Sequence, residues 1–189
     1  MIRKTLLALS ALSALTLSPL SASADTFNMD AGHSAILFKA KHFGVGYTYG
    51  RFNKMSGSYI SGATPTVSFE VDASSVDSAN AKRDDHLKGP DFFNVNETPK
   101  ITFKSTKWED KGDGSALVTG DLTLHGVTKS VTVTVTKVGE GNDPYGGYRV
   151  GFETTFSVKR SEFGITYGLP AAVSDDITLI VSFEGVRAK

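Results

Sequence analysis

Apolar and polar residues alternate through most of the chain from about Ser34 onward, and this alternation constrains the fold more than any other feature of the sequence. The clearest stretches are residues 33–42, 65–72, 99–108, 130–138, 147–158 and 177–186. Because successive side chains of a β-strand point to opposite faces of the sheet, the pattern indicates strands that bury only one face. Such strands are typical of antiparallel sheets. The sequence therefore predicts an all-β protein of roughly eight or nine strands.

The segments between the expected strands are short and rich in glycine, asparagine and aspartate, as at 110–114 and 139–147. These residues favour consecutive hairpins. An antiparallel set of this size either stacks as a sandwich or closes on itself, and closure removes the exposed edges that promote aggregation. Long strands with uniform alternation favour closure. We expect an extended antiparallel barrel of about eight strands, whose interior is either filled by side chains or able to hold one small ligand.

The alternation stops between Asp72 and Pro99. Ser75 to Lys88 is polar, with alanine and leucine at helical spacing, and Gly89-Pro90 follows as a stop signal. We therefore expect a short helical insertion around residues 75–90, between two strands.

The N-terminus has the features of a secretory signal peptide. Arg3 and Lys4 precede a long uncharged run that ends on the small-residue pattern Ala22-Ser23-Ala24. Cleavage is predicted after Ala24, which leaves one domain over residues 25–189 and a periplasmic location. The chain has no cysteine, so an exported domain of this kind relies on core packing rather than on disulfides.

The charge balance argues against polyanionic partners. Removal of Arg3 and Lys4 leaves 18 of the 20 basic residues against 20 acidic ones. Without a basic excess, neither nucleic acid nor an anionic membrane surface is favoured, and we expect no stable membrane insertion. The sequence leaves the oligomeric state open, a homodimer included.

Residues 83–94, RDDHLKGPDFFN, form the most enzyme-like stretch of the chain. In one interpretation, Arg83 pairs with a carboxylate or caps backbone groups while His86 bonds a strand end, so that the stretch is a structural clasp. In the other, it lies at a barrel mouth, with its charges toward a ligand's polar head and Phe92 and Phe93 toward its chain. A hydrolase that uses Arg83, Asp84, Asp85 and His86 is the alternative function, although no Gly-x-Ser-x-Gly elbow accompanies the cluster.

The histidines do not form a metal-binding pattern. The four are spread along the chain, at His33, His42, His86 and His125. Zinc sites normally show closely spaced ligand pairs with cysteine or carboxylate. We therefore expect no metal and no cofactor.

Taken together, the motifs resemble the YceI-like family of bacterial periplasmic proteins over nearly the whole predicted mature chain. The resemblance rests on Asp30-x-x-His33-Ser34, His42-x-Gly44, Gly50-x-Phe52, Arg83-Asp84-x-His86-Leu87, Asp91-Phe92-Phe93, Pro99-x-Ile101-x-Phe103, Gly120-x-Leu122-Thr123-Leu124-His125-Gly126-Val127-Thr128 and Arg160-Ser161-x-Phe163-Gly164. It implies a lipocalin-like barrel with a long apolar tunnel. It also implies binding of long-chain amphiphiles, such as polyisoprenoids, isoprenoid quinones or fatty-acid-like molecules, for transport or storage, and it implies no reaction.

Strand parity predicts which side chains face the interior and form the ligand-binding surface. A bulge reverses parity along the rest of a strand, so each assignment depends on regular pairing. The residues expected to face inward are Phe38, Phe69, Phe103, Leu122, Val133, Phe152, Phe156, Val181 and Phe183. Those expected near a mouth or lid are Phe43, Phe92, Phe93 and Phe163. Those expected to bind a head group or to serve as a structural clasp are His33, His42, Arg83, Asp84 and His86.

Overall fold

The structure is a computed structural model that describes residues 24–189. The predicted signal peptide, residues 1–24, lies outside the described residues apart from Ala24. The strands are β1 (Thr26–Met29), β2 (Ala35–His42), β3 (Gly46–Phe52), β4 (Met55–Ile60), β5 (Thr66–Asp72), β6 (Val76–Asp77), β7 (Lys100–Asp110), β8 (Ser115–Leu124), β9 (Val127–Asn142), β10 (Tyr148–Lys159) and β11 (Val173–Arg187). The helices are α1 (Ala81–Lys88) and the 3₁₀ turns η1 (Ala73–Ser75) and η2 (Arg160–Phe163).

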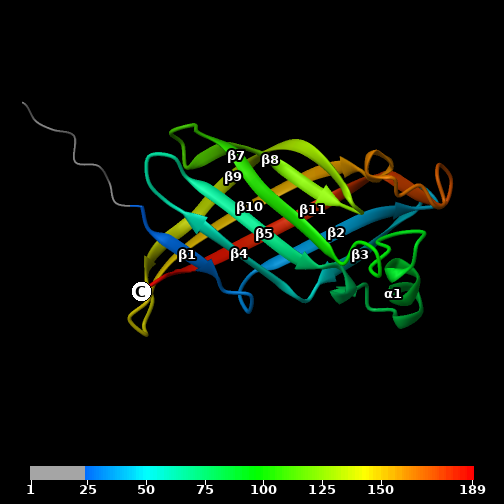
Figure 1. Cartoon of the computed structure of the whole chain (residues 1–189), viewed down its shortest axis with the longest axis horizontal. Helices are drawn as coiled ribbons and strands as arrows, with labels where there is room; N and C mark the ends of the chain where they lie inside the picture. Colours follow the sequence, from blue (N-terminus) through cyan, green and yellow to red (C-terminus); the bar gives the residue numbers. More distant parts are fainter. Residues whose placement is uncertain (1–23) are drawn as a thin grey trace, which may run out of the picture.

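Eight of these strands close into an antiparallel ring, as predicted from the alternation. The strand order around the ring is β1-β4-β5-β7-β8-β9-β10-β11, and β1 pairs with β11 to complete it. The result is an elongated barrel with long, tilted strands (Figure 1). None of the helices within residues 24–189 combines the length and the apolar character that crossing a bilayer requires.

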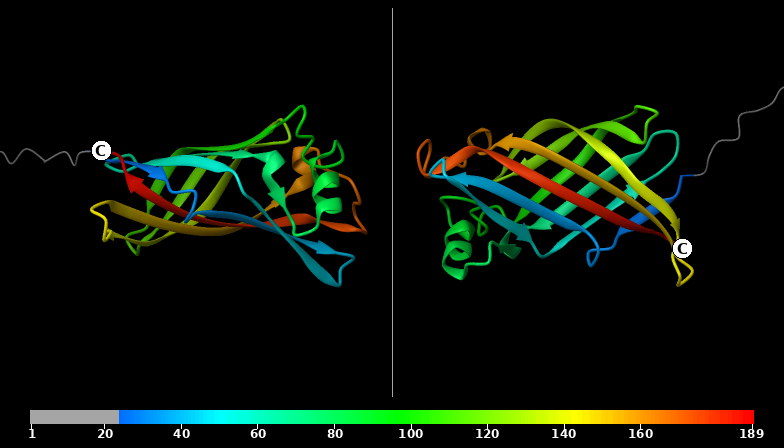
Figure 2. Two further views of the ribbon diagram at one scale, coloured as in Figure 1. Left: turned by 90° about the horizontal axis from the view of Figure 1, so that it is seen from below. Right: turned by 180° about the vertical axis from the view of Figure 1, so that it is seen from behind.

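Strand β11 divides its pairing between two partners, and this division opens one side of the barrel. Its last residues, Gly185 to Arg187, pair with β1, whereas Val173 to Ser182 pair with β2. Strands β2 and β3 therefore extend the sheet beyond the closed ring, and β3 pairs with β6 only through Arg51 and Phe52 on its other side. The β2–β3 hairpin bends away from the rest of the barrel at the end where α1 lies (Figure 2).

The predicted helical insertion is present but shorter and later than expected. The side chain of Asn80 caps α1 by accepting a hydrogen bond from the Arg83 backbone N–H at 3.0 Å. Ser75, the expected start of the insertion, lies in the separate turn η1, whose N-terminus is capped by the side chain of Asp72. Helix α1 has no buried residue, and among its side chains Leu87 packs against the core.

The packed core is divided into three clusters of buried side chains. One surrounds Phe38 and Phe52 near α1, a second surrounds Phe27 and Phe183 near the C-terminus, and a third lies on the wall formed by β8 and β9 around Val118. The aromatic and aliphatic side chains between these clusters are only half-buried, although they point into the barrel.

Candidate ligand-binding site

The barrel encloses a cavity of about 520 Å³. This volume lies within the range of about 300–1,000 Å³ that is usual for small-molecule sites. Strands β2–β5 and β7–β11 contribute to its wall, together with α1 and the loops that follow α1 and η2. The cavity therefore occupies the barrel interior, where parity predicted an apolar space.

Aromatic rings form much of the wall. The ring centroid of Phe69 lies 5.7 Å from that of Phe183, and Phe152 lies 4.9 Å from Tyr59 and 5.9 Å from Trp108. These contacts connect the cluster near the C-terminus with the middle of the barrel. Phe69 and Phe152 keep partial exposure because they border a hollow rather than other side chains.

The structure places all nine predicted interior residues at this cavity, together with two of the four residues expected near a mouth or lid. Those that line it are Phe38, Phe69, Phe92, Phe93, Phe103, Leu122, Val133, Phe152, Phe156, Val181 and Phe183. That they bind a ligand stays a prediction.

Two predicted residues lie elsewhere. Phe43 is at the tip of the β2–β3 hairpin, where its φ of 48° directs the chain through the turn and leaves the side chain 61% exposed. Phe163 is only 1% exposed within η2, and its carbonyl oxygen lies 3.0 Å from Nδ1 of His125. Neither residue lines the cavity: Phe43 lies at the hairpin tip next to Ala172 and His42, which do line it, whereas Phe163 is buried and fixes the η2 turn.

Polar side chains gather at the α1 end of the cavity. His42, Arg83 and His86 line it there, as does Tyr167. All four are exposed, so the cavity reaches solvent at this end. The rings of His86, Phe92 and Tyr167 contact one another, at centroid distances of 5.0 Å for His86 and Phe92, 4.9 Å for His86 and Tyr167, and 5.4 Å for Phe92 and Tyr167.

Of the four residues in the alternative hydrolase site, Arg83 and Asp84 converge on Ser78, whereas Asp85 and His86 have other partners. Arg83 donates from Nε to Ser78 Oγ at 2.7 Å and from Nη2 to the Ser78 carbonyl at 2.6 Å. The Asp84 carboxylate accepts from the Ser78 backbone N–H at 2.8 Å. Asp85 lies 4.0 Å from Lys88.

This arrangement corresponds to the clasp interpretation, with one correction. Arg83 caps a backbone group, the Ser78 carbonyl, and also holds the Ser78 hydroxyl. His86 pairs with Asp91, Nε2 to Oδ2 at 3.0 Å, rather than with a strand end. The difference arises because the chain folds back between α1 and β7, which sequence spacing does not show.

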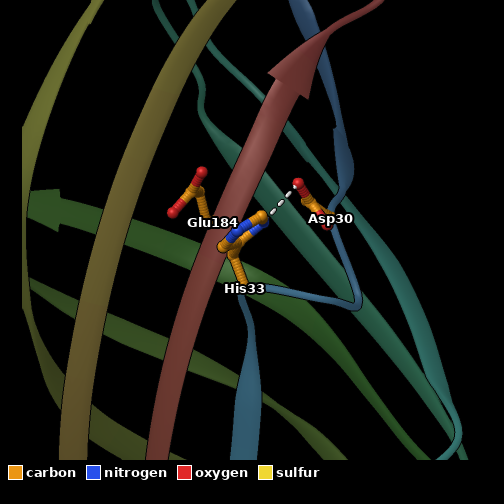
Figure 3. A group of neighbouring side chains, drawn as sticks. All are labelled: Asp30, His33 and Glu184. Atoms are coloured by element: carbon orange, nitrogen blue, oxygen red, sulfur yellow. Dashed lines mark hydrogen bonds and ion pairs between the residues drawn. The ribbon is translucent and has the colours of Figure 1, made fainter. Parts of the chain in front are cut away.

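His33 belongs to a separate cluster outside the cavity (Figure 3). Its Nδ1 lies 2.9 Å from Asp30 Oδ2. Arg149 donates to Asp30 Oδ2 at 2.8 Å, to Glu184 Oε1 at 2.5 Å and to Asp143 Oδ2 at 2.8 Å. The hydrogen bond from Arg149, and after it that from His33, lowers the pKa of Asp30 to about 2.

The geometry of Asp30, His33 and Glu184 would suit a metal ion, since their ligand atoms lie within 4.8 Å of one another. Arg149 already supplies the positive charge that these carboxylates need, and it engages their oxygens directly. The cluster ties the turn between β1 and β2 to β10 and β11. His33 is therefore a structural residue of the barrel seam and not part of the mouth.

Parity missed Trp108 because of a β-bulge. The pairing of β7 with β8 shifts between Ser105 and Lys107, which leaves Thr106 as the extra residue. Phe103 and Trp108 consequently both face the cavity, although regular alternation would place them on opposite faces. No sequence pattern identifies the bulge.

Arg160 begins the motif Arg160-Ser161-x-Phe163-Gly164, and the sequence alone indicates no role for it. It is 4% exposed and donates to the carbonyls of Ser174, Ile165 and Val173 at 2.9, 3.1 and 3.0 Å. Burial lowers its pKa. Arg160 thus fixes the chain on both sides of the loop that carries Tyr167, at the edge of the cavity.

Sequence similarity to known proteins extends over the whole predicted domain. Residues 27–185 match the model of the YceI-like domain. A UPF0312 protein of Yersinia pestis (strain Pestoides F) is 44% identical over 195 residues and is covered completely, as is this chain. A UPF0312 protein of Pseudomonas paraeruginosa is 42% identical over 192 residues, which are 99% of this chain and 100% of the relative.

Solved structures share the fold. BcnA of Burkholderia cenocepacia superposes with a TM-score of 0.75 at 26% identity, over 82% of this chain and 98% of BcnA. A polyisoprenoid binding domain from Saccharophagus degradans superposes with a TM-score of 0.68, over 86% of this chain and 98% of that domain, but at 15% identity it shows the fold alone. The family match and the closely related full-length sequences confirm the resemblance seen in the motifs: this chain belongs to the YceI-like family.

Proposed function

We propose that this protein is a periplasmic binding or carrier protein for a long-chain amphiphilic lipid, a polyisoprenoid, an isoprenoid quinone or a fatty-acid-like molecule. The observation that carries the proposal is the 520 Å³ hollow, walled by aromatic and aliphatic side chains and open at the α1 end. The description of the Saccharophagus degradans domain as polyisoprenoid binding supports the same ligand class.

Apolar burial supplies the main favourable free energy for such a ligand. At about 25 cal/mol per Å², transfer of several hundred Å² of hydrocarbon from water contributes on the order of 10 kcal/mol. Association opposes it with roughly 4–15 kcal/mol of lost freedom, so affinity depends on how much of the chain the cavity covers. The polar groups at the mouth, His42, Arg83 and His86, would then select the head group and its orientation.

The periplasmic location rests on the predicted signal peptide and is part of the proposal. The alternative hydrolase is less well supported, because Arg83 and Asp84 are both engaged with Ser78 and Asp85 lies beside Lys88. His86 and Asp91 form a pair that resembles part of a catalytic triad. Within residues 24–189, however, no serine or threonine hydroxyl is hydrogen-bonded to His86.

The proposal is tested by purifying the protein from the periplasm of its native host and analysing an organic extract by mass spectrometry. We expect a long-chain amphiphile at close to one molecule per protein. A correctly folded wild-type protein that is recovered empty would overturn the proposal.

A matched pair of variants on β9 shows whether the ligand occupies the cavity. Val135 faces the cavity, whereas Thr136 is exposed on the opposite face of the same strand. Val135→Trp should fill the hollow and abolish lipid recovery, while Thr136→Trp should leave it unchanged. Equal lipid content in the two variants, both folded, would place the lipid outside the cavity.

A further inference from the structure

The β2–β3 hairpin concentrates exposed apolar side chains. Within residues 24–189, eight large apolar residues are exposed, and four of them lie on this one hairpin. Phe43 and Val45 at its tip are 61% and 89% exposed, and Tyr47 and Tyr49 on β3 are 55% and 54% exposed. Scattered single residues of this kind need no explanation, but a cluster on one protruding element indicates an interaction surface.

The hairpin has two different faces. Its inner face carries Phe38, Thr48 and Phe52, which line the cavity. On the outer face, Lys39 lies opposite Tyr49 and Lys41 lies opposite Tyr47. The aromatic residues on β3 thus share their face with two lysines on β2, and the Lys39 ammonium lies 5.0 Å from the centre of the Tyr47 ring.

This outer face is basic, although the protein as a whole is close to neutral. The sequence contains no aspartate or glutamate between residues 31 and 69. In the part of the chain that the structure describes, neither lysine lies within 4.0 Å of a carboxylate. Acidic groups on the neighbouring strands have other partners. Asp176 on β11 lies 4.0 Å from Lys159, and Asp175 accepts hydrogen bonds from Ser161. Asp77 on β6 accepts hydrogen bonds from the Asn53 side chain and the Ala79 backbone N–H.

The hairpin tip lies beside the open end of the cavity. The Phe43 backbone N–H donates to the Ala172 carbonyl at 2.9 Å, and Ala172 and His42 both line the cavity. The hairpin projects from the barrel at this end (Figure 2). A surface that contacted the tip would therefore face the mouth.

We propose that the β2–β3 hairpin docks this protein reversibly on an anionic phospholipid surface. Phe43 and Val45 enter the interface, Tyr47 and Tyr49 lie at the level of the head groups, and Lys39 and Lys41 meet the lipid phosphates. Docking in this orientation places the cavity mouth against the bilayer. The inference goes beyond the proposed carrier function, because it rests on the exposed residues of the hairpin and does not require a lipid in the cavity.

Co-sedimentation of the mature protein, residues 25–189, with vesicles tests the inference. We expect binding to vesicles of equal parts phosphatidylglycerol and phosphatidylcholine, and little binding to pure phosphatidylcholine. Lys39→Gln with Lys41→Gln should weaken the partition about 30-fold, because each basic residue near an anionic surface contributes a few-fold. Phe43→Ser with Val45→Ser should weaken it at least about tenfold.

Two double variants serve as controls for composition. Lys104→Gln with Lys129→Gln removes two exposed lysines from other strands. Val138→Ser with Tyr145→Ser removes side chains that are 67% and 92% exposed on β9 and the loop that follows it, at the other end of the barrel. Both controls should bind as the wild type does. A loss of binding equal to that of the hairpin variants would overturn the inference.

Site-specific fluorescence locates the contact, since the natural chain has no cysteine to compete for a label. An environment-sensitive dye on Val45→Cys should brighten on addition of the anionic vesicles, whereas the same dye on Tyr145→Cys should not. The reverse pattern, or binding that does not depend on anionic lipid, would overturn the inference. So would concentration-dependent dimerisation through the hairpin without vesicle binding, which would show that a second copy covers this surface.

Discussion

The ring of Phe38 occupies the space in which a side chain at Gly50 would lie. The two residues are cross-strand partners on β2 and β3, and a Cβ atom added at Gly50 would come within 2.3 Å of the Phe38 ring. The same ring contacts those of Phe52 and Phe93, at centroid distances of 5.8 and 6.4 Å. Gly50 thus allows an aromatic cluster to form where the hairpin joins the barrel wall.

Gly50→Ala should destabilise the fold by about 1–3 kcal/mol, because the packed ring of Phe38 must move. Gly46→Ala is the matched control on the same strand, since a Cβ atom there meets no atom within 4 Å. Urea unfolding of both variants measures the difference. Equal stability of the two variants would show that the Phe38 ring relaxes without cost.

The neighbouring residues Phe92 and Phe93 should differ in their roles. Phe93 packs against the buried cluster of Phe38 and Phe52, so Phe93→Ala should reduce the free energy of unfolding by about 3 kcal/mol. Phe92 contacts His86 and Tyr167 at the mouth, so Phe92→Ala should cost about 1 kcal/mol or less. Its main effect should be on lipid retention, measured by mass spectrometry of the purified variants. Loss of stability in Phe92→Ala equal to that in Phe93→Ala would contradict this division.

The cluster around Arg149 should make stability fall at acidic pH. Arg149 and His33 lower the pKa of Asp30 from 3.8 to about 2, so the folded state resists protonation more than the unfolded state does. The stabilisation is complete above the unfolded pKa of 3.8 and is lost as the pH falls through about 2. Thermal unfolding between about pH 5 and pH 2 should therefore show a steeper decline in the wild type than in Asp30→Asn. Asp85→Asn, which changes a side chain that is 82% exposed, should keep the wild-type slope.

Lysine at position 160 should not maintain the stability that Arg160 provides. The guanidinium serves three backbone carbonyls in different directions, and a single ammonium on a flexible stem does not reproduce that geometry. Arg160→Lys should lower the free energy of unfolding by about 2–3 kcal/mol, since buried carbonyls lose charged donors. Lys159→Ala, at a side chain that is 55% exposed, should change it by less than about 0.5 kcal/mol. Urea unfolding compares the two, and wild-type stability in Arg160→Lys would contradict the role assigned to the guanidinium.

The candidate site shows which cavity-facing residues strand parity can predict and which it cannot. Parity placed Phe69, Phe152 and Val181 at the interior because their strands pair regularly around them. It failed for Trp108, where the bulge on β7 reverses the alternation. It did not predict that Tyr59 faces the cavity. Tyr59 packs against Trp108 and Phe152, and this burial raises its pKa.

By itself, the sequence determined the strand-rich fold, the closure into a barrel, the short helical interruption and the family, because alternation and local motifs are properties of neighbouring residues. Only the tertiary structure decided what depends on distant segments. It showed that β11 divides its pairing between β1 and β2, that Arg83 and Asp84 both hold Ser78, and that Arg149 joins three carboxylates at the seam. It also placed Phe43 on an exposed basic hairpin, since a net charge close to zero does not show where the charges gather once the chain is folded.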